Sequence, residues 1–250
     1  MRCGCWTATA ANGETLIVTE QDAALNAGLL TFATRDDAAA ALAAEVCETL
    51  TEALAARGRA TLVVSGGTSP VGFFHHLRRL PLSWERITVI PSDERVVALQ
   101  HPDRNESMIR RELLQGTAAA ARLRGLLPAS GSTVNLPQLA ETLPASFDAV
   151  VLGMGADGHT ASLFPGSPEL ETALHSAEPL ALLNVPQLGA RRVSLTPSAL
   201  LTGRRIDLLF FGEEKRAVYA AAIAGNDPVE YPVRSVLRQS VVPVRAFWAP

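Results

Sequence analysis

Short apolar runs alternate with helical patterns along most of this chain. The runs with the length of single strands are Thr61–Val64, Ile87–Ile90, Asp148–Leu152, Arg192–Thr196, Ile206–Phe211 and Val244–Trp248. The segments with helical periodicity are Asp36–Arg57, Val71–Arg79, Asn105–Gln115, Glu213–Ala224 and Pro232–Gln239. This alternation predicts an α/β fold with a mostly parallel sheet that helices cover on both faces.

The first expected helix, Asp36–Arg57, contrasts with the residues before it. Leu42, Val46 and Leu50 recur every four residues and would share one buried face. Gly58 follows the expected end of the helix, as glycine commonly does. Residues 1–30, in contrast, mix Gly, Thr and Ala without periodicity. We therefore expect residues 1–30 to be an irregular N-terminal extension and residues 31–250 to form a single α/β domain.

Composition narrows the possible classes of function. The 250 residues carry a formal net charge of −3 and no basic block, which argues against nucleic acid as a partner. No apolar run reaches the roughly 18 residues that a membrane span needs, and no signal peptide is recognisable. Cys3, Cys5 and Cys47 form no CxxC pair, so we expect a cytoplasmic protein without a disulfide framework. The sequence leaves open whether the protein is a monomer or a homodimer.

The glycine-rich segment Gly153–Pro165 places a carboxylate two residues before an imidazole. A carboxylate beside a histidine fixes the ring tautomer and stabilises the protonated ring, so Asp157 and His159 are candidates for general acid–base chemistry. An isolated histidine is more often structural, but this one follows an expected strand in a glycine turn. The segment also matches G-x-G-x-x-G. We do not favour a dinucleotide site, because Asp157 would face the pyrophosphate and Pro165 would interrupt the helix that binds it.

A second glycine-rich segment, Ser65–Pro70, connects an expected strand to an expected helix. Its glycines expose backbone N–H groups and its hydroxyls add donors beside the positive start of the helix, which favours a phosphate site. It lacks the GxxxxGK[ST] pattern of a P-loop, and an ordinary turn is the alternative interpretation. The candidate phosphate-binding residues are Gly66, Gly67, Thr68 and Ser69.

Other polar groups follow the remaining strands. Ser92–Arg95 could form a polar pocket wall, although taken alone it is better interpreted as a solvated loop with a surface ion pair. Arg191, Arg192 and Lys215 could together clamp a phosphate, although such cations are more often surface charges. Ser65 and Ser162 lie outside any G-x-S-x-G elbow, which makes a covalent acyl-enzyme the minority interpretation. No HExxH motif or Cys/His cluster is present, so we expect no metal site.

These clusters, in this order, resemble the 6-phosphogluconolactonase family. The residues that carry the resemblance are Ser65–Pro70, Asp93–Arg95, His101–Asp103, Asn105, Gly153–Pro165, Arg192–Thr196, Gly212 and Lys215. The similarity runs from about Phe32 to Trp248. It implies a Rossmann-like, NagB/RpiA-like fold that is shared with glucosamine-6-phosphate deaminases. It also implies hydrolysis of 6-phospho-D-glucono-1,5-lactone to 6-phosphogluconate, the second step of the pentose phosphate pathway, and therefore a small phosphosugar lactone as partner.

The resemblance, taken with the motifs, suggests which site residues would bind the substrate and which would catalyse the reaction. The substrate-binding residues would be Gly66, Gly67, Thr68, Ser69, Asp93, Asn105, Gly155, Arg192 and Lys215. The phosphate would rest on the Gly66–Ser69 loop, helped by Arg192 and Lys215, which would orient the distant lactone carbonyl.

The catalytic residues would be His159, Asp157 and Arg95. His159, oriented by Asp157, would take a proton from water as the water attacks the carbonyl carbon. Arg95, or N–H groups of the turn around Gly155 and Gly158, would stabilise the negative charge on the carbonyl oxygen. Ester hydrolysis requires neither redox chemistry nor a metal, so no cofactor is expected.

Arg104, Phe164 and Arg95 differ from what the related families carry, and two of these differences help to separate the alternative functions. Arg104 stands where the family usually has Ser, which puts one hydrogen bond of that loop in doubt. The related deaminases carry Glu where this chain has Phe164 and Tyr where it has Arg95, which disfavours a sugar-phosphate isomerase or deaminase. A non-catalytic sugar-phosphate sensor would not need the Asp–His pair and would usually bring a basic helix-turn-helix, which the sequence lacks.

Overall fold

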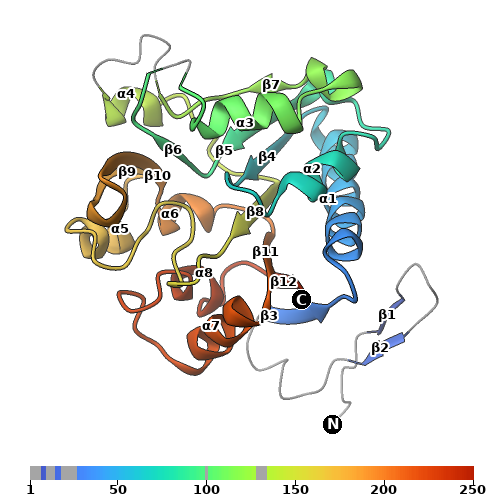
Figure 1. The fold of residues 1–250 in the computed structure, drawn as a ribbon. Helices are drawn as coiled ribbons and strands as arrows, with labels where there is room; N and C mark the ends of the chain where they lie inside the picture. Colours follow the sequence, from blue (N-terminus) through green and yellow to red (C-terminus); the bar gives the residue numbers. More distant parts are fainter. Residues whose placement is uncertain (1–6, 10–14, 18–26, 99–100, 128–133) are drawn as a thin grey trace.

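A parallel sheet forms the centre of the molecule (Figure 1). The computed structural model describes residues 7–9, 15–17, 27–98, 101–127 and 134–250 of the chain. Within them, the seven strands of this sheet lie in the order β3 (Ala27–Thr31), β12 (Val244–Ala249), β11 (Ile206–Phe211), β8 (Ala149–Gly153), β4 (Ala60–Val64), β5 (Ile87–Pro91) and β7 (Arg122–Leu123). All neighbouring pairs are parallel. The predicted α/β fold with a mostly parallel sheet is confirmed.

Two hydrophobic clusters cover the two faces of this sheet. Successive residues of β4 alternate between them: Leu62 and Val64 belong to one cluster, and Val63 belongs to the other. The first cluster contains side chains from α1 (Arg35–Arg57), α2 (Val71–Leu77) and α3 (Asn105–Glu112). The second contains side chains from α6 (Pro197–Leu200), α7 (Glu213–Ala224) and α8 (Arg234–Leu237), with α4 (Leu136–Ala140) packed against it. Helices therefore shield both faces of the central strands from water.

Local chemistry sets the bounds of α1. The Thr34 hydroxyl accepts a hydrogen bond from the Asp37 N–H at 3.1 Å, so a side chain satisfies one of the free N–H groups at the helix start. At the other end, Gly58 has φ 69°, a left-handed conformation that glycine adopts without strain, and its N–H donates to the Leu54 carbonyl at 2.8 Å. Leu42, Val46 and Leu50 are buried, as their spacing predicts.

A smaller antiparallel sheet lies beside the main one. It consists of β6 (Asp93–Arg95), β10 (Ala190–Leu195) and β9 (Leu180–Val185). Its register places Arg192 opposite Arg95 and Ser194 opposite Asp93. The expected strand Arg192–Thr196 therefore belongs to this sheet and not to the parallel one. Helix α5 (Leu170–His175) packs against β9 in a small third cluster.

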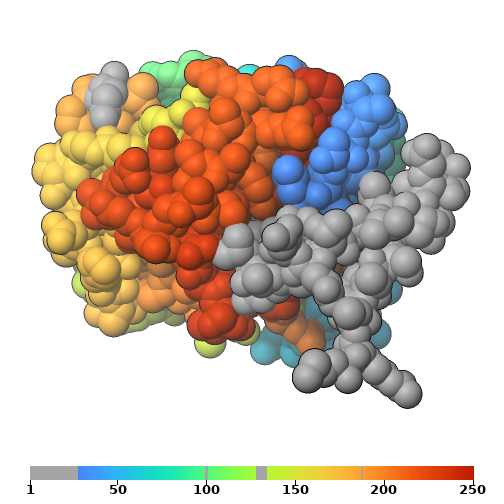
Figure 2. Space-filling model, turned by 90° about the horizontal axis from the view of Figure 1, so that it is seen from below, coloured from blue at the N-terminus to red at the C-terminus, as the bar shows by residue number. Residues whose placement is uncertain are grey.

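The sheet includes a segment that the sequence analysis assigned to the irregular extension. β3 pairs in parallel with β12, so the main sheet begins at Ala27, before the expected boundary at residue 31. Nearer the N-terminus, β1 (Thr7–Thr9) pairs with β2 (Thr15–Ile17). Cys3 and Cys5 lie outside the described residues. Figure 2 shows the segment after residue 27, in blue, beside the C-terminal segments in orange and red, in agreement with the β3–β12 pairing.

The parallel arrangement brings distant loops to one edge of the sheet. Strands β4, β5, β8 and β11 are followed by Ser65, Ser92, Met154 and Gly212, respectively. Ligands of open α/β sheets bind beyond these carboxyl ends. The glycine-rich segments and the charged residues of the sequence analysis thus emerge at the same edge.

We expect the buried face of α1 to contribute strongly to the stability of the fold. Leu50→Ala removes a fully buried side chain from α1 and should lower the free energy of unfolding by about 2–5 kcal/mol. Val241→Ala, at a side chain that is 75% exposed, should change it by less than about 0.5 kcal/mol. Urea unfolding of both variants measures the difference; equal effects would contradict the placement of α1 against the sheet.

Candidate active site

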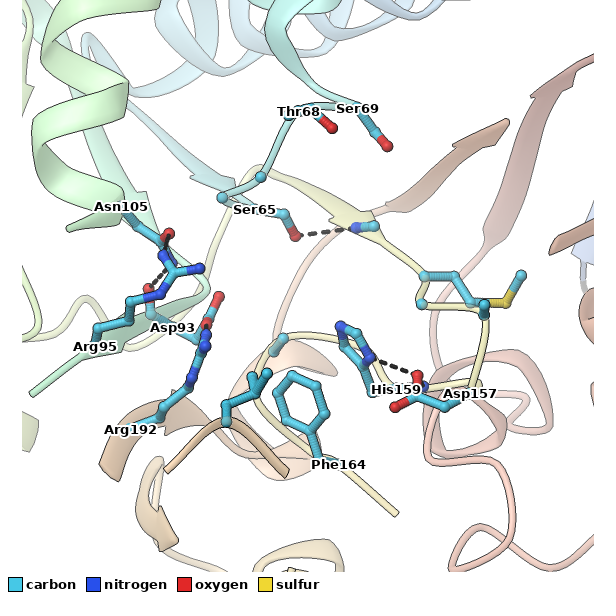
Figure 3. Close-up of a pocket in the computed structure, with 18 of the residues that line it drawn as sticks. Ser65, Thr68, Ser69, Asp93, Arg95, Asn105, Asp157, His159, Phe164 and Arg192 are labelled. Atoms are coloured by element: carbon cyan, nitrogen blue, oxygen red, sulfur yellow. Dashed lines mark hydrogen bonds and ion pairs between the residues drawn. The ribbon is translucent and has the colours of Figure 1, made fainter. Parts of the chain in front are cut away.

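A cavity of about 560 Å³ opens at the carboxyl ends of β4 and β8, between the main sheet and the smaller sheet. Every site residue named from the sequence lines it: Gly66, Gly67, Thr68, Ser69, Asp93, Arg95, Asn105, Gly155, Asp157, His159, Arg192 and Lys215. Figure 3 labels ten of the lining residues, which come from loops, from β6 and β10, and from the start of α3. The structure therefore brings the predicted residues together in one place, and their roles stay predictions.

Asp157 and His159 form a hydrogen-bonded pair. The Asp157 Oδ1 lies 2.6 Å from His159 Nδ1 and also accepts the His159 backbone N–H at 3.1 Å. Burial alone would raise the pKa of the Asp157 carboxyl, but the hydrogen bonds and charge of His159 outweigh it and hold that pKa below its usual value. An ionised carboxylate at Nδ1 keeps the proton on that nitrogen, which leaves Nε2 free to accept one. Figure 3 shows the second ring nitrogen directed toward the open cavity.

The turn that carries this pair is held from two sides. Gly158 has φ +76°, and its carbonyl accepts the Val233 N–H at 2.9 Å. A Cβ at Gly158 would meet the Tyr231 ring at 2.3 Å, so that ring packs directly on the turn. The Thr160 hydroxyl donates to the Gly153 carbonyl at 2.9 Å. The chain before α8 thus supports the turn, a role that no local sequence signal at Tyr231 indicates.

Phe164 packs against the imidazole. Its ring is stacked on the His159 ring, with the two centroids 3.9 Å apart. The Arg192 guanidinium lies 5.5 Å from the Phe164 ring centroid. Figure 3 shows Phe164 between these two residues. An aromatic ring in this position limits the motion of the imidazole and places an apolar surface beside it.

The glycine loop is tied to the neighbouring strand. The Ser65 hydroxyl accepts the Gly153 N–H at 3.0 Å, which joins the two glycine-rich segments. Gly66 lies against Asn105, because a Cβ there would fall 2.0 Å from the Asn105 Oδ1. The hydroxyls of Thr68 and Ser69 form no hydrogen bond with the part of the chain that the structure describes, and both line the cavity. These free donors are what an anion site requires.

The segment Ser92–Arg95 is not a solvated surface loop, which was the interpretation favoured for it when taken alone. Asp93 and Glu94 are 4% and 0% exposed, because β6 pairs with β10 and is covered by the following loop. The Ser162 hydroxyl donates to Asp93 Oδ2 at 2.5 Å, and Arg192 Nη1 lies 3.7 Å from the same oxygen. Among the described residues, the Ser162 hydroxyl thus has a carboxylate and no histidine as its partner, and the minority interpretation of Ser162 as a nucleophile stays untested.

Glu94 organises the wall next to Asp93. Its carboxylate accepts three backbone N–H groups, from Arg95, Asn105 and Glu106, each at 2.8 Å. Burial raises the pKa of the Glu94 carboxyl despite these donors and the nearby charge of Arg104. The carboxylate therefore ties the start of α3 to β6. Sequence reasoning missed this role, since nothing in an Asp-Glu-Arg run distinguishes a buried carboxylate from an exposed one.

Arg104 occupies the interior beside this carboxylate. Its side chain is fully buried, with Nη2 2.7 Å from Glu106 Oε2 and Nε 3.8 Å from Glu94 Oε2. Asn105, the next residue, donates to the Asp93 carbonyl at 2.8 Å and accepts from Arg95 Nη1 at 3.1 Å. The departure at Arg104 thus leaves the cavity wall intact.

The cations occupy different ends of the cavity. Arg192 pairs with Asp93, and burial lowers the pKa of its guanidinium, with the charge of Arg95 acting in the same direction. Burial also lowers the pKa of the Lys215 ammonium; the charges of Asp157 and Glu214 oppose this shift, and the charge of Arg35 adds to it. Lys215 makes no hydrogen bond or close ion pair within the described chain, whereas Arg192 already has a carboxylate.

The remaining histidines have separate partners. His75 lies 2.9 Å from Glu112, and His76 lies 2.8 Å from Asp36, so the adjacent rings point to different neighbours as predicted. Among the described residues, no group of three or more His, Cys, Asp or Glu side chains is arranged to hold a metal ion. Within the same ranges, no helix has both the length and the apolar character to cross a membrane.

Comparison with known proteins identifies relatives along most of the chain. A sequence model of the family described as glucosamine-6-phosphate isomerases/6-phosphogluconolactonase matches residues 33–248. The chain is 43% identical to a 6-phosphogluconolactonase of Pseudomonas aeruginosa over 230 residues, covering 89% of the chain and 95% of the relative. It is 38% identical to one of Rhizobium meliloti, covering 90% of the chain and 100% of the relative.

Solved structures share the same fold. A 6-phosphogluconolactonase from Shewanella baltica superposes with a TM-score of 0.86 at 37% identity, covering 90% of this chain and 98% of that one. A monomeric glucosamine-6-phosphate deaminase superposes with a TM-score of 0.72 at 18% identity, covering 89% and 97% of the two chains. The second likeness concerns the fold alone.

The Asp157–His159 contact should depend on the absence of a side chain at position 155. In Gly155→Ala, the Cβ would lie 2.2 Å from His159 Nδ1 and 2.4 Å from Asp157 Oδ1, so both side chains must move from these positions, and we expect their hydrogen bond to be lost. Gly153→Ala is the matched control, because its Cβ meets nothing closer than 4.0 Å. We expect the NMR signal of a hydrogen-bonded Nδ1 proton to disappear in the first variant only. Its persistence in Gly155→Ala would contradict the described turn.

Proposed function

The chain belongs to the glucosamine-6-phosphate isomerase/6-phosphogluconolactonase family, and from that premise we propose that it hydrolyses 6-phospho-D-glucono-1,5-lactone with His159 as the general base. The relatives that match most of its length are 6-phosphogluconolactonases, which makes the chain a hydrolase of that kind. One observation carries the assignment of the base: the His159 ring, hydrogen-bonded through Nδ1 to Asp157 at 2.6 Å, faces the cavity that also holds the glycine loop.

In the proposed reaction, His159 Nε2 accepts a proton from a water molecule while the water oxygen attacks the lactone carbonyl carbon. Asp157 stabilises the imidazolium that forms, since its lowered pKa keeps it ionised. The tetrahedral intermediate then breaks its bond to the ring oxygen, which takes the proton from Nε2. One water is consumed, and the open chain carries the new carboxyl and hydroxyl groups of 6-phosphogluconate.

The oxyanion requires a donor that is not already occupied. The Gly155 N–H donates to the His159 carbonyl and the Gly158 N–H donates to the Gly155 carbonyl, so both amides are used within the turn. Arg95 Nη1 is anchored by the Asp103 carbonyl at 2.5 Å and by Asn105, which fixes the guanidinium in the cavity wall, whereas its Nη2 makes no hydrogen bond with the described residues. Of the candidates named from the sequence, this favours Arg95 as the group that stabilises the carbonyl oxygen.

The two groups of cations suggest an orientation for the substrate. The phosphate would lie at Thr68, Ser69 and Lys215, where hydroxyls and an ammonium have no other hydrogen-bond partner among the described residues. Arg192 lies with Asp93 and close to Arg95, so we assign it to the lactone end and not to the phosphate, which revises its expected role. Anchoring the phosphate at the far end orients the carbonyl toward the base.

The main competing activity is deamination of glucosamine 6-phosphate on the same fold. The stacked Phe164 ring occupies the place beside His159 where the sequence analysis expects a deaminase to carry a carboxylate. We therefore propose lactone hydrolysis and not ring opening followed by deamination. Parallel assays with freshly prepared lactone and with glucosamine 6-phosphate separate the two activities.

Replacement of the base should remove most of the activity. His159→Gln should lower kcat by about 10²- to 10⁴-fold and leave KM nearly unchanged, because the phosphate contacts remain. His175→Gln, at an exposed histidine that does not line the cavity, is the control and should have no effect on kcat or KM. A pH-stat assay of lactone hydrolysis measures both variants. If His159→Gln retains near-normal kcat, the imidazole is not the base.

Loss of the ammonium should weaken binding more than chemistry. Lys215→Ala should raise KM by about 10- to 100-fold at nearly constant kcat, as expected for one charge-assisted hydrogen bond. Because burial lowers the pKa of Lys215, its charge is present below that pKa and is lost on raising the pH sooner than for an ordinary lysine. Affinity for 6-phosphogluconate should therefore fall at alkaline pH in the unaltered protein and much less in Lys215→Arg. Calorimetric titration across pH tests this; identical profiles would count against the phosphate role.

A further inference from the structure

A second cavity adjoins the first across the glycine loop. It has a volume of about 550 Å³ and shares Thr68, Ser69 and Lys215 with the first cavity. Its other lining residues come from the start of α1, the start of α2 and the end of β11: Arg35, Asp36, Ala39, Gly72 and Phe211. The residues assigned to the phosphate are therefore the common wall of two cavities, and not the end of one.

Arg35 is held so that part of its guanidinium remains available. Its Nε donates to a backbone oxygen of Pro250, the last residue of the sequence, at 2.9 Å, and the guanidinium lies 5.4 Å from the centroid of the Phe211 ring. The terminal nitrogens, Nη1 and Nη2, have no partner among residues 27–98, 101–127 and 134–250. Stacking on an aromatic ring and one anchoring bond reduce the entropy that the side chain would lose when it binds a ligand.

The side-chain carboxylates next to Arg35 in the chain have other partners. Asp36 lies 2.8 Å from His76, and Asp37 accepts the Thr34 hydroxyl at 2.6 Å. The charge of Arg35 does reach Lys215, where it acts with burial to lower the pKa of the ammonium against the opposing charges of Asp157 and Glu214. Arg35 and Lys215 thus line a common cavity, in which their like charges favour the entry of an anion.

We infer that the phosphate subsite extends into the second cavity, with Arg35 as a phosphate-binding residue opposite Lys215. The ligand class is a phosphomonoester dianion, which carries enough charge for two cations and enough acceptor oxygens for a guanidinium, an ammonium and two hydroxyls. The inference rests on the proposed function only for the identity of the substrate. It makes Arg35 a specificity-determining residue, since a lactone without phosphate would gain nothing from it.

The single lysine of the chain gives a direct probe of this subsite. Protein labelled with ¹³C at lysine Cε yields one side-chain signal, from Lys215, and inorganic phosphate added to the unaltered protein should shift it saturably. Arg35→Gln should raise the Kd for phosphate about tenfold in this titration. Arg216→Gln is the matched control: that guanidinium also lies over an aromatic ring, 4.5 Å from the centroid of Trp248, on the same helix as Lys215, but it lines neither cavity.

Kinetics give the second arm of the test. Arg35→Gln should raise KM for the phosphorylated lactone about tenfold at constant kcat and leave hydrolysis of unphosphorylated glucono-1,5-lactone unchanged. The inference is overturned if Arg35→Gln and Arg216→Gln bind phosphate equally well, or if the loss is the same for both lactones. If phosphate binding depends on Arg35 but the unaltered protein hydrolyses no lactone, the proposed function fails and this subsite stands.

Discussion

The central strands of the main sheet must bury both of their faces, and this requirement organises the rest of the molecule. A parallel strand can be followed by another only if the chain returns across a face of the sheet, so each crossover supplies the cover that the strands need. In β4, alternate side chains enter the two clusters, one under α1 and α2 and the other under the C-terminal helices. The same crossovers direct all strand ends to one edge, where the loops of the candidate site meet on a rigid support.

The site contains charges that the protein keeps out of water. Glu94 and Arg104 are both fully buried, and burying an ion pair seldom stabilises a fold, because desolvation offsets the attraction. Three backbone N–H donors to Glu94 make this arrangement tolerable and fix the start of α3 against β6. What this arrangement provides is position: Arg95 and Asn105 contact each other and project into the cavity from backbone that cannot shift independently.

Much of this arrangement could be predicted from local patterns, and the remainder depends on contacts between distant segments. The helix at 36–57 and the strands before both glycine loops follow from periodicity and from turn chemistry, which act over a few residues. The burial of Asp93 and Glu94 depends on pairing with β10, about a hundred positions away, and nothing within Ser92–Arg95 encodes it. Likewise, β3 is a strand because β12 offers it a partner, since its own sequence lacks a strand pattern. The packing of Tyr231 on Gly158 is likewise a contact between distant segments that neither local sequence predicts.

The position of β3 also affects how the protein avoids self-association. This strand pairs along one side of β12, which otherwise would form the border of the sheet. β12 is almost entirely apolar and buried, the kind of segment that recruits another chain when its backbone groups lack partners. Removal of the residues up to Thr31 would therefore expose the unpaired backbone groups of β12. Because the residues of the candidate site would remain, we expect this shorter protein to aggregate before it loses catalytic activity.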